Sequence, residues 1–155
     1  LRNSSKKSFS LDKENFLSPR NQLFQHSSLN SFVNARKKIS IYNTVRSRVG
    51  RGWPTGALEY LDHHTRHFNN KERAFLLSKI ANGYYLANLD DKAIKVLNDE
   101  SFIEEPYSEG LWIKGLAYYR KGEFQKASRQ FLILSKITGL FKSTTTIKSF
   151  SFEKF

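Results

Sequence analysis

The chain has 155 residues, of which 39% are hydrophobic and 14% aromatic, so it has room for one domain and enough apolar side chains for a core in part of its length. It contains no cysteine, which excludes a disulfide framework, a thiolate metal site and a thiol nucleophile. It also lacks an apolar run long enough for a membrane span or the core of a signal peptide.

The formal net charge of +12 invites a nucleic-acid interpretation, but the charge is concentrated at the two ends. Residues 1–40 carry eight basic and two acidic side chains, whereas residues 71–135 carry ten basic and nine acidic ones. A basic face on the folded part is therefore not expected, and we predict no specific nucleic-acid binding. Weak binding of polyanions by the ends is a third hypothesis beside the two given below.

Residues 1–34 are rich in Ser and Asn, and their Phe and Leu residues follow no period. This composition predicts a disordered basic tail, although Leu23, Phe24, Leu29, Phe32 and Val33 are compatible with one short docking helix. The folded domain is expected over residues 35–137.

Apolar residues at spacings of three and four predict six helices within that domain. They are expected over residues 35–49, 54–68, 71–86, from 91 onward, 107–120 and 124–137, paired into three hairpins. Gly52, Asn88 and Gly122 lie at the expected turns, and Pro54 suits the first turn of a helix. Residues 138–155 are rich in Ser, Thr and Phe and predict an irregular tail, which suggests a truncated or frame-shifted chain.

The second and third hairpins repeat with a period of 34 residues. Leu77, Ala81, Tyr84, Ala93 and Leu97 align with Leu111, Gly115, Tyr118, Ala127 and Phe131. Small residues such as Gly115 and Ala127 allow two helices to cross closely, and Gly122 lets the chain reverse. This period and pattern are typical of tetratricopeptide (TPR) repeats, so the expected fold is an all-α, TPR-like solenoid of about three hairpins. An ordinary three-hairpin bundle is the alternative.

In such a solenoid the first helix of each hairpin lines a concave groove. The repeat register places seven candidate binding residues there: Ser78, Asn82, Tyr85, Trp112, Leu116, Tyr119 and Arg120. Trp, Tyr and Arg are frequent anchors of protein interfaces, so a protein or peptide partner is the expected ligand. The alternative is that these side chains pack against a further repeat.

No catalytic constellation is evident. His63 and His67 lie four residues apart, but no third ligand accompanies them, and His64 adds only a further polar group. There is no serine nucleophile elbow, glycine-rich phosphate loop or HExxH pattern. We therefore expect no enzyme activity from this chain alone, no metal site and no cofactor.

Two stretches resemble the N-terminal helical region of bacterial soluble lytic murein transglycosylases: residues 51–61 (RGWPTGALEYL) and residues 111–127 (LWIKGLAYYRKGEFQKA). The resemblance covers about residues 40–135. It implies a scaffold for a separate lysozyme-like domain that cleaves peptidoglycan with one Glu. That domain is not in this sequence, so no catalytic residue can be carried over.

Two functional hypotheses follow. The first is a non-catalytic scaffold fragment of a lytic transglycosylase that takes part in peptidoglycan turnover, in which case the resemblance implies a periplasmic location. The second is an independent TPR adaptor that binds a protein or peptide in its groove, for which a cytoplasmic location is expected.

Overall fold

The computed structural model describes the backbone of residues 19–139, with side chains described for residue 31 and residues 33–139. This part of the chain consists of helices and contains no β-strand, which confirms the predicted all-α fold. The helices are α1 (Pro19–Gly50), α2 (Pro54–His63), α3 (Asn70–Leu86), α4 (Asp90–Val96), α5 (Glu100–Glu104), α6 (Ser108–Arg120) and α7 (Phe124–Thr138), with a 3-10 helix η2 (Thr65–His67). The chain divides into two units, Leu1–Lys37 and Lys38–Phe155, which are described separately.

The described part of the first unit is helical throughout, because α1 begins at Pro19 rather than at the expected residue 35. Proline is well suited to the first turn of a helix, and residues 20–49 contain no further proline or glycine that would interrupt it. Residues 1–18 of the expected disordered tail lie outside the described residues.

Three turns of one form join α1 to α2, α3 to α4 and α6 to α7. The central residues Gly52, Asn88 and Gly122 have positive φ angles of 75°, 60° and 77°. In each turn the next residue donates its N–H to the carbonyl five positions earlier, as in a helix C-cap of the Schellman type. The pairs are Trp53 to Arg48, Leu89 to Tyr84 and Glu123 to Tyr118, each at 2.9 Å.

An alanine follows each of these turns at the same distance along the chain. Ala57, Ala93 and Ala127 donate their backbone N–H groups to the residue four positions earlier, and all three are buried. A small side chain is needed there because the two helices joined by the turn approach each other closely. The chain therefore repeats one helix–turn–helix geometry three times, which we call the first (α1–α2), second (α3–α4) and third (α6–α7) segments.

The second helix ends earlier than expected, at His63 instead of residue 68, and η2 completes the connection to α3. Asn69 caps α3. Its side chain accepts from the Glu72 N–H at 2.9 Å, and the Glu72 carboxylate accepts from the Asn69 N–H at 3.0 Å. This capping box satisfies two backbone donors that the helix itself leaves unpaired.

The short helix α5 was not expected. Asp99 begins it by accepting from the Ser101 N–H at 3.0 Å, and Phe102 anchors it with 2% of its surface exposed. Arg73 ties this region to α2 and η2: its guanidinium donates to Asp62 at 2.8 Å, Asp99 at 3.0 Å and Thr65 at 2.7 Å.

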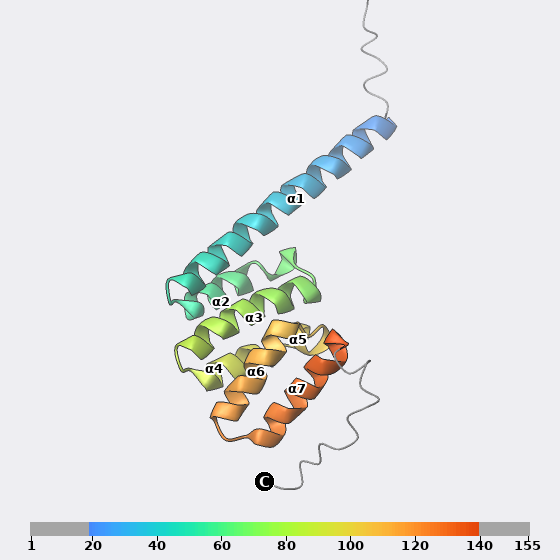
Figure 1. The fold of residues 1–155 in the computed structure, drawn as a ribbon. Helices are drawn as coiled ribbons and strands as arrows, with labels where there is room; N and C mark the ends of the chain where they lie inside the picture. Colours follow the sequence, from blue (N-terminus) through green and yellow to red (C-terminus); the bar gives the residue numbers. More distant parts are fainter. Residues whose placement is uncertain (1–18, 140–155) are drawn as a thin grey trace, which may run out of the picture. The chain divides into compact units, whose positions relative to one another are not determined.

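Helix α3 lies at the centre of the second unit and contacts α2, α4, α5 and α6 (Figure 1). Its fully buried Leu77, Ile80 and Ala81 join Val45 of α1 and Leu61 of α2 in one core. The third segment packs on this core through α6, which contacts both α3 and α4.

Helix α7 ends at Thr138, one residue beyond the expected end, and Gly139 follows with a left-handed φ of 70°. Residues 140–155 of the expected irregular tail lie outside the described residues.

Candidate functional site

Two hollows lie between α1 and α3 in the second unit, along one face that both helices share. On α1 this face carries Ile39, Tyr42, Arg46 and Val49, which follow helical spacings of three and four. On α3 it carries side chains at the same spacings, from Lys71 to Leu86. We call the face that these residues form the inner face.

The first hollow, here called the aromatic hollow, has a volume of about 410 Å³. Its lining residues are Lys38, Ile39, Tyr42, Phe68, Lys71, Glu72, Phe75, Leu76 and Tyr107. The ring of Phe75 stacks on Tyr42 with centroids 5.9 Å apart and forms a T-shaped pair with Tyr107, with centroids 5.0 Å apart. Because these rings hold one another in place, the apolar wall is formed before any ligand binds.

Charged groups surround the mouth of the aromatic hollow. The Lys38 ammonium donates to both oxygens of Glu72, at 2.8 and 2.9 Å. Partial burial favours a raised pKa for the Glu72 carboxyl, but hydrogen bonds from Lys38 and the Asn69 N–H outweigh it and lower that pKa. Lys71 is exposed at the same mouth, and no carboxylate among the described residues lies within ion-pair distance of it.

The second hollow, here called the polar hollow, has a volume of about 540 Å³ and lies toward the C-terminal ends of α1 and α3. It is lined by Arg46, Val49, Gly50, Gly52, Lys79, Asn82, Gly83, Leu86, Ala87 and Glu109. Lys79 forms an ion pair with Glu109 of α6. Arg46, in contrast, is exposed and has no carboxylate partner in the described part of the chain.

The seven sequence-predicted binding residues do not form one site. Asn82 lines the polar hollow. Ser78 must be corrected: its side chain is fully buried, its Oγ donates to the Ala74 carbonyl at 2.8 Å, and it therefore cannot line an open surface. Ser78 lies on α3, the first helix of its segment, but α6 covers it there, and Gly110 of α6 lies directly against Ser78.

Tyr85 and Arg120 contact each other instead of facing an open groove. The Arg120 guanidinium lies 4.0 Å from the centre of the Tyr85 ring and donates to the Tyr85 carbonyl at 2.8 Å. It also donates to Asn88 at 2.8 Å and to the Asp90 carboxylate at 2.7 Å. Arg120 thus links α6 to the turn between α3 and α4, which is a structural role.

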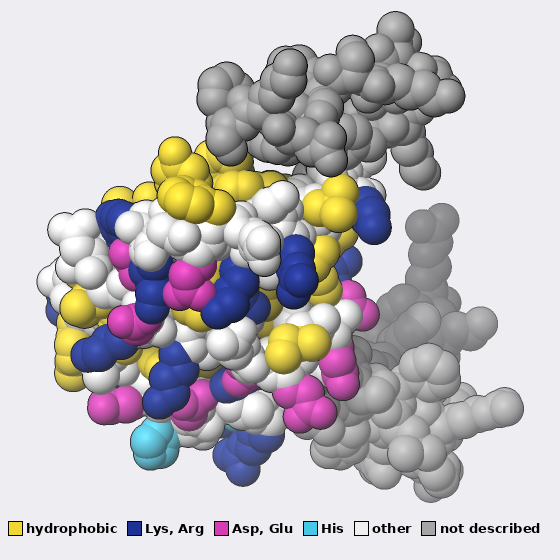
Figure 2. Space-filling model, turned by 90° about the horizontal axis from the view of Figure 1, so that it is seen from below, with side chains coloured by type: hydrophobic (Ala, Val, Ile, Leu, Met, Phe, Trp, Pro, Cys, Tyr) yellow, Lys and Arg dark blue, Asp and Glu magenta, His cyan; other side chains and the backbone are white. Residues whose placement is uncertain are grey.

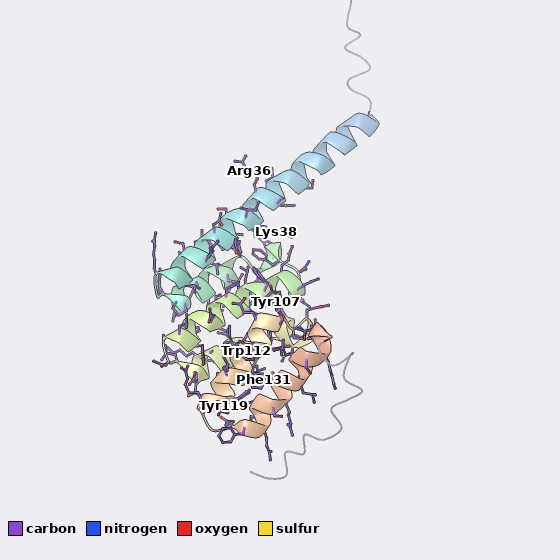
Figure 3. The ribbon with its side chains drawn as sticks, in the orientation of Figure 1. Arg36, Lys38, Tyr107, Trp112, Tyr119 and Phe131 are labelled. Atoms are coloured by element: carbon purple, nitrogen blue, oxygen red, sulfur yellow. The ribbon has the colours of Figure 1, made fainter. Side chains whose placement is uncertain are left out.

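Trp112, Leu116 and Tyr119 lie on α6, outside both hollows. Trp112 packs against Phe131 of α7 at 5.3 Å, whereas Tyr119 lies near the other end of α6 (Figure 3). Trp112 is 52% exposed and Tyr119 61% exposed, and Leu116 is half-buried. They form a surface separate from the hollows between α1 and α3.

Sequence reasoning missed Ile39, Tyr42, Arg46, Phe75 and Lys79. The sequence did contain a signal for one of these residues, Arg46. The offset of 36 residues that aligns Gly52 with Asn88 also aligns Arg46 with Asn82. The groove register, extended to the first segment, would therefore have placed Arg46 beside Asn82 on the inner face.

The histidines of α2 and η2 make local contacts. His63 Nδ1 lies 2.6 Å from the Glu59 carbonyl, and His64 Nδ1 lies 2.8 Å from the Tyr60 carbonyl. Among residues 19–139 no group of three or more His, Cys, Asp or Glu side chains is arranged to hold a metal ion. None of the helices described is long and apolar enough to cross a membrane.

Basic and acidic side chains are interspersed on the face that Figure 2 shows, and no large patch of one sign is visible on it. Comparison of the chain with protein-family models, with curated proteins and with solved structures finds no match.

Proposed function

We propose that this chain is a non-catalytic, TPR-like helical scaffold that holds a protein or peptide partner on its inner face. The repeated turn geometry and the 34-residue register support the repeat part of the proposal. Contacts of α6 with both helices of the second segment fit the stacking expected of successive repeats.

The observation that carries the binding part is the pair of hollows between α1 and α3. Protein pockets that bind ligands are concave, mostly apolar and largely formed in advance, with volumes of about 300–1,000 Å³. The aromatic hollow meets that description, since Phe75 is held between Tyr42 and Tyr107. The adjoining polar hollow supplies the amide of Asn82 and several charged groups, which can orient a backbone.

The test is a selection of peptides from a displayed random library on the purified chain, followed by affinity measurements on two variants. Ile39→Glu places a charge in the aromatic hollow, and the 59% exposure of Ile39 means that folding should be little affected. Ile103→Glu on α5 is the matched control, since Ile103 is 64% exposed and lines neither hollow.

The proposal expects a loss of affinity of at least about tenfold, or 1.4 kcal/mol, for Ile39→Glu and no loss for Ile103→Glu. Helical circular dichroism should be unchanged in both variants. Failure to select any peptide, or equal affinity losses in the two variants, would contradict the proposal.

A second candidate is the scaffold region of a lytic murein transglycosylase, with a periplasmic location and a role in peptidoglycan turnover. The observation that favours it concerns the residues 51–61 that carry the resemblance. The Trp53 ring covers Gly56 so closely that an added Cβ would lie 2.1 Å from it. The Arg48 guanidinium lies 4.9 Å from the centre of the Trp53 ring and 4.7 Å from the centre of the Tyr60 ring. These residues therefore serve packing, as expected of a scaffold.

The test of this candidate is to sequence the gene beyond the codon for Thr138 and to translate that sequence in all three frames. Further helical repeats followed by a lysozyme-like domain support the transglycosylase scaffold, and their absence contradicts it. Purified chain should release no anhydro-sugar products from peptidoglycan, and release of such products would overturn the non-catalytic assignment.

A further inference from the structure

We infer that the inner face takes an acidic peptide segment in which an apolar anchor, aromatic or branched aliphatic, lies two residues from an Asp or Glu. The anchor occupies the aromatic hollow and the carboxylate pairs with Arg46. This inference rests on the proposed function and specifies the partner of the same site.

The aromatic hollow selects the anchor. Its walls are ring faces and aliphatic side chains, and the charges at its mouth are those of the Lys38–Glu72 pair and Lys71. A polar side chain would leave water there and find no partner in the wall, whereas an apolar side chain gains about 25 cal/mol for each Å² that it buries. Aromatic anchors gain further ring contacts from Tyr42, Phe75 and Tyr107, which line the hollow.

The charge balance selects the acidic residue. Four basic side chains line the two hollows, and two of them are already neutralised: Lys38 by Glu72 and Lys79 by Glu109. Arg46 and Lys71 have no carboxylate partner among the described residues. Each hollow therefore has one uncompensated positive charge, and an arginine can bind a carboxylate through two parallel hydrogen bonds.

Helix geometry sets the spacing between anchor and acid. Tyr42 lies in the wall of the aromatic hollow, and Arg46 follows four residues later on the same face of α1. A helix rises 1.5 Å per residue, so these positions are about 6 Å apart along the axis. An extended peptide advances about 6.6 Å over two residues and directs both side chains to the same side. An anchor and an acid at positions i and i+2 therefore match the spacing on α1.

The test uses three labelled synthetic peptides of nine residues with one common background. The first carries Phe at position 4 and Asp at position 6, the second has Lys in place of Asp, and the third has Ser in place of Phe. Binding to the purified chain is followed by fluorescence polarisation at low ionic strength, with Arg46→Glu as the variant. Arg129→Glu on α7 is the matched control, because Arg129 is an exposed arginine outside both hollows.

The wild-type chain should bind the Phe/Asp peptide at least about tenfold more tightly than the peptide that lacks the Phe anchor. It should bind the Phe/Asp peptide about three- to tenfold more tightly than the Phe/Lys peptide, since Arg46 is exposed. Arg46→Glu should lower the affinity for the Phe/Asp peptide and raise the affinity for the Phe/Lys peptide, because the charge at position 46 is reversed. Arg129→Glu should leave all three affinities unchanged. Circular dichroism of both variants should match the wild type, so that a loss of binding is not a loss of fold.

Equal affinity of the wild-type chain for the Phe/Asp and Phe/Lys peptides would overturn this inference. It would also be overturned if Arg46→Glu did not increase the affinity for the Phe/Lys peptide. Its failure can be distinguished from that of the proposed function. Library peptides that lose affinity with Ile39→Glu but not with Arg46→Glu would preserve the scaffold proposal and refute the acidic ligand. If no peptide of any kind binds, both fail.

Discussion

The second and third segments follow one register of 34 residues, yet the same helical positions lie in the core of one and on the surface of the other. Ser78 and Leu97 are fully buried beneath α6. The equivalent Trp112 is 52% exposed and the equivalent Phe131 half-buried, since none of the described helices covers the third segment as α6 covers the second. A repeat register thus specifies a position on a helix, but the next helix determines whether that position is core.

The second segment, which α6 covers, and the third segment, which no described helix covers in the same way, also differ in the size of their side chains. Gly110 of α6 lies so close to Ser78 of the second segment and to Phe102 of α5 that an added Cβ would come within 2.4 Å of both, so only small side chains fit at that contact. On the third segment Trp112 occupies the position of Ser78, and its ring packs against Phe131 of α7 at 5.3 Å. A second ring pair, Tyr119 with Phe124, also joins α6 and α7 at 5.3 Å. Aromatic pairing across α6 and α7 partly replaces the packing that α6 provides for the second segment.

The largest effect expected from this comparison is a difference between Leu97→Ala and Phe131→Ala. Leu97 is fully buried between α4 and its neighbours, so its truncation should cost about 3 kcal/mol of the free energy of unfolding. Phe131 is half-buried and its truncation should cost roughly half as much, although more atoms are removed. Urea denaturation of the two variants measures both values. Equal costs would mean that the third segment is as well packed as the second.

A second difference is the ion network at the base of the second segment. Arg73 is 9% exposed and binds Asp62 and Asp99, whereas the third segment carries Tyr107 at the equivalent position. Replacing Arg73 by Met should cost about 2 kcal/mol, because it leaves two carboxylates unpaired, and their partial exposure limits the loss. Arg129→Met on the exposed face of α7 is the control and should cost nothing measurable.

The same variant has a pH signature. Partial burial favours a raised pKa for Asp99, but Arg73 and the Ser101 N–H outweigh it and lower that pKa below its ordinary value. A carboxyl whose pKa is depressed in the folded state stabilises the fold above its unfolded pKa, near 3.9, and loses this contribution as pH falls through the folded pKa. The difference in unfolding free energy between wild type and Arg73→Met should therefore shrink below about pH 4. A difference that stays constant from pH 7 to pH 3 would exclude the ion network as its cause.

These differences show what could be predicted from the sequence. Gly52, Asn88 and Gly122 adopt positive φ, and Ala57, Ala93 and Ala127 allow close helix crossings; because these requirements are local, the turns and most helix boundaries could be predicted. Helix α5 was missed because its stability depends on tertiary contacts. Its five residues form no periodic pattern, and it is held by the Asp99 cap and by the burial of Phe102.

The candidate site was predicted less well than the fold, for a related reason. A period identifies Ser78 and Asn82 as neighbours on one helical face, but Ser78 is covered by Gly110 and Asn82 is open to the polar hollow. The hollows themselves depend on the distance between α1 and α3 and on the mutual support of Tyr42, Phe75 and Tyr107. Spacing along the chain contains no information about either.

A smaller effect is expected at Lys114, which α6 carries where α3 carries the fully buried Ile80. Lys114 is 8% exposed, and its ammonium donates to the Leu97 carbonyl at 3.0 Å. No carboxylate in the described part of the chain forms an ion pair with it. Burial lowers the pKa of the Lys114 ammonium, so the folded state disfavours its charged form.

Lys114→Met keeps the length of the side chain and removes the buried charge, and it should raise the unfolding free energy at pH 7 by about 1 kcal/mol. A lysine whose pKa is depressed in the folded state adds stability as pH rises from that pKa toward the unfolded value near 10.4. The advantage of the variant should therefore decrease between pH 7 and pH 10, as measured by urea denaturation at both values. A variant that is less stable than the wild type at pH 7 would show that the hydrogen bond to Leu97 outweighs the burial cost.

The smallest effect is expected for Trp112→Ser, which gives the third segment the residue that the second has at Ser78. Because half of the Trp112 surface is exposed, the variant should lose mainly the ring contact with Phe131, a cost of about 0.5–1 kcal/mol. The reciprocal variant Ser78→Trp should be far more disruptive, because Gly110 leaves no room for a ring. If Trp112→Ser instead destabilised the chain as strongly as Leu97→Ala, the ring would have to be buried in solution, and a cover over α6 and α7 would be required. Sedimentation of the wild-type chain would then show whether a second copy supplies that cover.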